Sequence, residues 1–160
     1  MIEDKGKIQK MMIILSKATL ENVYAAFVLA NGARMEGIAA EVFFTFFGLE
    51  AIHKKKLENL HMATVGNPAI NMPTMVGGLP GMEALASHMM KKEMEKIDMP
   101  DIPEFLDILS ASGVRLWACK LAMDMFHYKK EDLYEGVEAV ITIGDFYKQS
   151  EGEGVHMLFV

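Results

Sequence analysis

Five apolar runs along the chain have the length and composition of buried strands. They are IQKMMIIL (8–15), AAEVFFTFF (39–47), VRLWAC (114–119), EAVITI (138–143) and VHMLFV (155–160). Segments with helical spacing of apolar residues separate them, at 20–35, 82–97, 103–113, from about 120, and at 144–150. Because strand, helix and strand at this spacing indicate parallel crossovers, the pattern predicts a three-layer α/β/α sandwich. Its sheet would be five-stranded and mainly parallel, and flavodoxin-like in general appearance.

Two of the predicted helices differ in the burial expected for them. Apolar residues surround the axis of 20–35, so this helix should be heavily buried, with Thr19 at its N-cap and Gly37 at its C-cap. The apolar residues of 82–97 form one methionine-rich stripe: Met82, Leu85, Ala86, Met89, Met90, Met94 and Ile97. Because methionine is a flexible filler of cores, the stripe is expected to pack inward. A Cu(I) site of thioethers is the less favoured interpretation.

A segment rich in Met, Pro and Gly interrupts the regular pattern at about 56–82. It carries Pro68, Pro73, Pro80 and the pair Gly77-Gly78, and it has few charges. Its methionines, Met62, Met72 and Met75, are candidates for an adaptable contact surface. Together with the helix that follows, this insert offers more apolar surface than a lone domain leaves to water, which predicts a homo-oligomer.

Composition limits the class of protein. The 160 residues fit one domain covering 1–160, and 51% apolar with 24% charged residues is globular composition. The net charge of −6, without a basic cluster, disfavours nucleic acid. The charged opening MIEDKGKIQK does not resemble a signal peptide. The longest apolar run, 38–49, contains Glu41 and is shorter than the roughly 20 residues that span a bilayer, so a cytoplasmic protein without a membrane span is expected.

Cys119 is the sole cysteine, so neither an internal disulfide nor a Cys-rich zinc site is available. The five histidines include no close pair at helical spacing, and no metal site is expected. Glycine-rich phosphate-binding patterns do not occur either, which disfavours phosphate cofactors. Any chemistry is therefore expected to rest on one thiol without a cofactor.

The position of Cys119 favours a nucleophile. It ends the predicted strand 114–119 and precedes the helical KLAMDMF, at the sheet edge where α/β proteins collect their sites. A helix N-terminus carries partial positive charge and unpaired amides, which stabilise a thiolate. A free cysteine is also a common small core residue, and position alone leaves both interpretations open.

Other residues follow strand ends at the same predicted edge: Lys17, Phe47, Gly48, Gly144 and Asp145. Lys17 and Lys120 are candidates to stabilise the thiolate or attract an anionic donor, with a solvated lysine as the alternative for each. Asp124 is a third candidate for assisting Cys119, but an acid in the first turns of a helix can also serve the helix dipole alone.

The run GVRLWACKLAMDMF (113–126) resembles the methionine-rich branch of the DsrE/DsrF family, some of whose members are described as peroxiredoxin-like. AEVFFTFFGLEAI (40–52) and the Met-rich middle section support the resemblance. The matching positions are Cys119, Met123 and Asp124. Ala122 stands where serine is expected and His127 where glycine is expected, so this chain lacks the hydroxyl of that serine.

This resemblance implies a DsrE/F-like fold and a sulfurtransferase in which Cys119 accepts sulfur as a persulfide. It implies small sulfur-carrier proteins of the TusA-like kind or rhodaneses as partners, and assembly into oligomers. A one-cysteine peroxidase passing through a sulfenic acid is an alternative. A non-catalytic scaffold or binding subunit is another.

Overall fold

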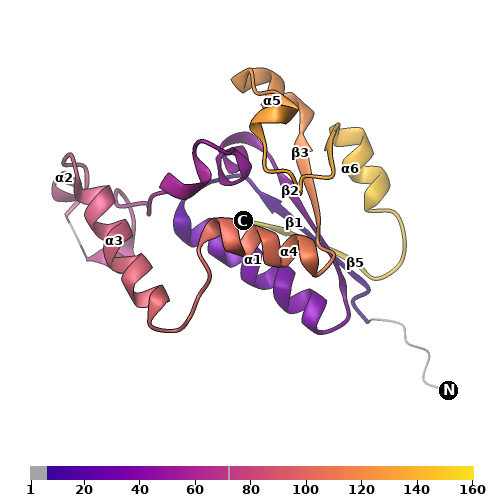
Figure 1. The fold of residues 1–160 in the computed structure, drawn as a ribbon, viewed down its shortest axis with the longest axis horizontal. Coiled ribbons are helices and arrows are strands. Elements are labelled where there is room, and N and C mark those ends of the chain that lie inside the picture. Colours follow the sequence, from indigo (N-terminus) through magenta and orange to yellow (C-terminus); the bar gives the residue numbers. More distant parts are fainter. Residues whose placement is uncertain (1–6, 72) are drawn as a thin grey trace.

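The computed structural model describes residues 7–71 and 73–160; the chain opening at 1–6 and Met72 lie outside the described residues. Five strands form one all-parallel sheet in the order β4-β3-β2-β1-β5 (Figure 1). The strands are β1 (Lys10–Leu15), β2 (Ala39–Phe44), β3 (Arg115–Cys119), β4 (Ala139–Ile141) and β5 (Val155–Phe159). The predicted α/β sandwich with a parallel five-stranded sheet is confirmed.

Helices connect the strands, and short helical segments also occur in the Met-, Pro- and Gly-rich segment at about 56–82. The α-helices are α1 (Leu20–Met35), α2 (Thr74–Gly77), α3 (Met82–Glu95), α4 (Ile102–Ala111), α5 (Lys120–Phe126) and α6 (Ile143–Gln149). Short 3-10 segments are η1 (Phe46–Ile52), η2 (Leu57–Asn59), η3 (Pro68–Ile70) and η4 (Lys130–Asp132). None of the helices in residues 7–71 and 73–160 combines the length and apolar character that crossing a membrane requires.

Aromatic side chains fix the layers on the two faces of the sheet. On one face, the Phe27 ring of α1 meets Phe44 of β2 edge to face at 6.3 Å and Phe105 of α4 at 5.5 Å. On the other, Phe146 of α6 stacks on Phe43 of β2 at 4.6 Å. Since neighbouring residues of a strand point to opposite faces, Phe43 and Phe44 anchor the two layers separately. We name these the α1 face and the α6 face.

The α6 face is only partly covered. In the parallel register, Met157 and Phe159 of β5 pair with Met12 and Ile14 of β1, and Ile14 pairs with Phe43, so all these side chains share the α6 face. The seven-residue α6 lies over the middle of the sheet, and Met157 and Phe159 remain 43% and 73% exposed. An edge strand therefore presents apolar side chains to solvent.

Two strands end two or three residues earlier than predicted. The predicted strand 39–47 ends at Phe44, because Phe46 takes a positive φ of 45° and begins η1. The predicted strand 138–143 ends at Ile141, because Thr142 caps α6. An apolar run does not reveal where the backbone turns, since residues beyond a strand end can be as apolar as the strand itself.

Burial departs from the prediction at two helices. The outer side of α1 leaves Val28 and Leu29 exposed, so this helix is buried on one side and not all round. Met90 and Met94 of α3 pack against the core, whereas Leu85, Met89 and Ile97 of the predicted stripe are 52%, 62% and 68% exposed. The expected inward packing of the stripe is wrong for these three residues. The reason is that α2 and α3 lie beside the sheet instead of over it (Figure 1).

Candidate functional site

Cys119 lies where the sequence predicts it, at the carboxyl end of β3. It is both the last residue of this strand and the N-cap of α5. Its side chain is buried, with 1% of the residue exposed, and its Sγ takes part in no hydrogen bond with the described residues. The thiol therefore has packing neighbours but no polar partner that fixes its orientation.

Residues from three strand ends surround the thiol. The hollow at Cys119 is lined by Thr45 and Phe46 after β2, by Leu121, Ala122, Asp124 and Met125 of α5, and by Ile143 at the start of α6. Four of these form an apolar rim that is also open to solvent: Phe46 is 51% exposed, Leu121 63%, Met125 49% and Ile143 44%. We call these four residues the collar. The thiol thus lies just beneath an apolar part of the surface.

A tight contact between β1 and the start of η1 positions Phe46. The Thr45 amide donates to the Leu15 carbonyl at 3.0 Å, and the Gly48 amide donates to the Ser16 carbonyl at 3.1 Å. A Cβ at Gly48 would lie 2.1 Å from the Leu15 carbonyl oxygen, so only glycine fits there. Phe46, held between these bonds, has a left-handed backbone that costs a non-glycine residue about 1–2 kcal/mol.

A capping box places Ile143 at the hollow. The Thr142 hydroxyl accepts from the Asp145 amide at 3.1 Å, and Asp145 Oδ2 accepts from the Thr142 amide at 3.2 Å. Hydrogen bonding from the Thr142 hydroxyl, and then from its amide, lowers the pKa of Asp145. Asp145, expected at this edge of the sheet, therefore starts α6 instead of lining the hollow.

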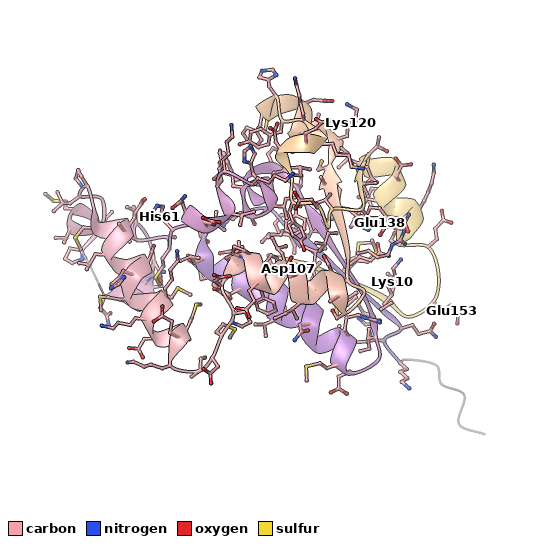
Figure 2. All side chains as sticks on the ribbon, in the orientation of Figure 1. Lys10, His61, Asp107, Lys120, Glu138 and Glu153 are labelled. Carbon is pink, nitrogen blue, oxygen red and sulfur yellow. The ribbon has the colours of Figure 1, made fainter. Side chains whose placement is uncertain are left out.

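The three residues proposed to assist Cys119 lie in different surroundings. Asp124 lines the hollow and accepts two bonds from the Lys120 ammonium, at 2.8 and 2.9 Å, so these two residues are partners. Figure 2 shows Lys120 at the α5 end of the molecule, well apart from Lys10. Lys17 lies in a separate hollow with Lys55, Lys56 and Phe47. Phe47 and Phe46, adjacent in sequence, thus line different hollows.

The two departures from the DsrE/DsrF pattern have structural counterparts. Ala122 is buried in the wall of the hollow that also contains Cys119. His127 is the C-cap of α5 with φ 57° and ψ 32°, a left-handed conformation that glycine adopts without strain. A glycine is therefore the residue that this backbone favours.

The collar was not predicted as part of the site. Phe46, Leu121, Met125 and Ile143 were assigned to strands or helices, with no role near the thiol. A positional signal was available, because each follows a strand that ends at the same edge of the parallel sheet. The predicted ends of β2 and β4 lie three and two residues beyond the observed ones, so Phe46 and Ile143 fall inside the predicted strands and not after them.

A parallel α/β protein with a single thiol at the carboxyl edge of its sheet is the class that this fold and site define. The chain belongs to the DsrE/DsrF/DrsH-like family, whose sequence profile matches residues 7–158. It is 34% identical over 138 residues to the sulfur carrier protein DsrE2 of Allochromatium vinosum, covering 81% of this chain and 86% of that protein. It is 25% identical over 134 residues to the uncharacterized protein YrkE of Bacillus subtilis, covering 79% and 82%.

Solved structures share the fold at low sequence identity. A protein of unknown function from Methanobacterium thermoautotrophicum superposes with a TM-score of 0.58 at 13% identity, covering 94% of this chain and 98% of that one. The ychN protein of E. coli superposes with a TM-score of 0.57 at 17% identity, covering 95% and 99%. The resemblance to the DsrE/DsrF family drawn from the sequence is confirmed, and so is a sulfur-carrier role within this family.

Proposed function

We propose that this protein carries sulfane sulfur as a persulfide on Cys119 and transfers it to the thiol of a partner protein. The observation that carries the proposal is the single cysteine at the junction of β3 and α5, in a chain of this family. Sulfur exchange needs one nucleophilic thiol, and a chain with one cysteine has no internal thiol to resolve the adduct as a disulfide.

The chemistry needs no cofactor. The Cys119 thiolate attacks the outer sulfur of a donor persulfide, R–S–SH; the bond between the two donor sulfurs breaks, and R–S⁻ leaves. The outer sulfur keeps its proton, so the protein holds Cys119–S–SH. An acceptor thiolate then attacks that outer sulfur, and the Cys119 thiolate is released. Each step exchanges one sulfur–sulfur bond for another, without net oxidation.

The surroundings of Cys119 support sulfur transfer over the peroxidase alternative. Peroxide reduction favours a cation beside the sulfur, yet the Lys120 ammonium is bonded to Asp124. The apolar collar is also suited to contact with another protein, since aromatic and methionine side chains are enriched in interface cores. These features favour a partner's thiol as the reactant.

The proposed partners are small sulfur carriers of the TusA-like kind and rhodaneses as donors. The cytoplasm is the proposed compartment, because a reducing environment keeps a single exchange thiol available.

We also infer that the protein self-associates through β5, an edge strand that pairs with β1 alone among the described strands. Identical chains with a net charge of −6 repel each other, so a contact between them is favoured where acidic residues are absent. Val155–Phe159 contains no acidic residue.

Intact-protein mass spectrometry tests the central proposal. Wild-type protein treated with inorganic polysulfide should gain the mass of one or more sulfur atoms and lose it to an added thiol. Cys119→Ser, which keeps nearly the same volume, should fold and take up nothing. If wild type gains no sulfur from any sulfane donor but is readily oxidised by hydrogen peroxide, the peroxidase alternative replaces the carrier. A thiol inert to both donors would indicate a scaffold.

A further inference from the structure

The proposed sulfur transfer requires that a donor sulfur reach the buried thiol of Cys119. A sulfur exchange needs Sγ in contact with the incoming sulfur, but only 1% of Cys119 is exposed. The collar residues line the same hollow as the thiol, and they are 44–63% exposed. Side chains with that exposure are free to change rotamer on a fast timescale, whereas the strands below them are not. The collar is therefore the part of the site that can regulate entry.

Phe46 differs from the rest of the collar in its backbone. It has a φ of 45°, whereas Leu121, Met125 and Ile143 have no positive φ. The hydrogen bonds of Thr45 to Leu15, the last residue of β1, and of Gly48 to Ser16, the next residue, hold this strained conformation from both sides. The Phe46 ring is half exposed, so burial in the core does not explain why a large aromatic residue occupies a position that favours glycine. Strain of this kind clusters at ligand clamps and switch regions.

We propose that Phe46 is a specificity-determining residue of the Cys119 site. This inference rests on the proposed sulfur transfer and concerns which sulfur donors reach the thiol. As a half-exposed residue that lines the hollow, Phe46 admits small sulfane donors such as inorganic polysulfide. A persulfide carried on a folded protein reaches Sγ only after the ring turns aside. The turn needs a side-chain rotation alone, because the backbone on both sides of Phe46 is fixed by its bonds to β1.

Alkylation of the native thiol by reagents of two sizes tests this directly. The rates of iodoacetamide and of fluorescein maleimide are measured for wild type, Phe46→Ala and Phe46→Gly. The matched control is Phe47→Ala, because Phe47 is similarly exposed but lines the hollow of Lys17. Both Phe46 variants lack the ring, so they should react with the bulky maleimide about tenfold faster than wild type. Iodoacetamide should gain less, and Phe47→Ala should match wild type.

Two outcomes would overturn the proposal: wild-type rates with both reagents in Phe46→Gly, or an equal gain with both reagents in every variant. Phe46→Gly relieves the strain of a positive φ, so it keeps the test valid if Phe46→Ala folds poorly. Alkylation involves no sulfur transfer, so the result stands even if Cys119 never accepts sulfur. Where it does, Phe46→Gly should raise uptake from a sulfur-loaded rhodanese more than uptake from polysulfide.

Discussion

The Lys120 ammonium contacts both carboxylate oxygens of Asp124, at 2.8 and 2.9 Å, one turn along α5 from Cys119. Both side chains are more than half exposed. The pair neutralises the nearest cation to the thiol along the chain, so Asp124 decides how much positive charge the Cys119 thiolate experiences.

Breaking this pair should change the rate at which Cys119 is alkylated at neutral pH. Asp124→Asn removes a negative charge and releases Lys120, so alkylation by an anionic reagent such as iodoacetate should be roughly threefold faster. Lys120→Met should slow it. Glu93→Gln, which breaks the exposed Lys96–Glu93 pair on α3, is the control and should have no effect. Identical rates in all variants would remove both residues from the site.

Loss of the Trp117 donor should destabilise the fold. Trp117 Nε1 donates to Glu41 Oε2 at 2.8 Å, and this carboxylate, 3% exposed, also pairs with Lys10 at 2.7 Å. Trp117→Phe leaves a buried acceptor with one donor fewer, so the free energy of unfolding should fall by about 1–3 kcal/mol. Urea denaturation followed by circular dichroism measures it.

The matched control for this change is Tyr134→Phe, which removes an exposed hydrogen bond to Asp107. It should cost less than about 1 kcal/mol, because water replaces the lost partner. Equal losses in the two variants would show that the burial of Glu41 is not what makes the Trp117 bond important.

Stability should decline on acidification partly through Glu138. The hydrogen bond from Arg115 holds the pKa of Glu138 below its ordinary value of 4.5, against a smaller opposing effect of desolvation. A lowered pKa means that the stabilisation is complete above the ordinary value and is lost as pH falls through the lowered one. Both side chains are more than 40% exposed, so solvent screening limits the stabilisation from this ion pair to at most about 1 kcal/mol. Denaturation of wild type and Glu138→Gln from pH 7 to 3 should show a shallower decline in the variant.

Self-association should depend on β5 and not on α3. Phe159→Glu puts a charge on the exposed edge strand, so it should shift sedimentation toward the monomer. Met89→Glu puts the same charge on the exposed face of α3 and should leave the oligomer unchanged. The reverse result would move the interface to the methionine-rich helix, and a wild type that stays monomeric at high concentration would exclude self-association.

Much of the architecture could be predicted from the sequence because apolar periodicity records which segments are buried. The run VRLWAC followed by a helical pattern located Cys119 at a strand end. Gly37, expected at the C-cap of the first helix, follows the actual C-cap, Glu36, and has a φ of 74°. The same periodicity was misleading on α3, where spacing defines a face but does not say whether another layer covers it. Leu85 and Met89 therefore lie exposed.

Local sequence thus determined the class of fold and the place of Cys119 between a strand and a helix. The tertiary structure alone decided the strand order, and with it which residues surround the thiol. Phe46 and Ile143 come from segments on either side of Cys119 in sequence, and they meet it because β2 and β4 flank β3. The left-handed turn at Phe46 is decided by the close approach of Gly48 to the Leu15 carbonyl. Such contacts join residues far apart in the chain, and periodicity within a segment contains no information about them.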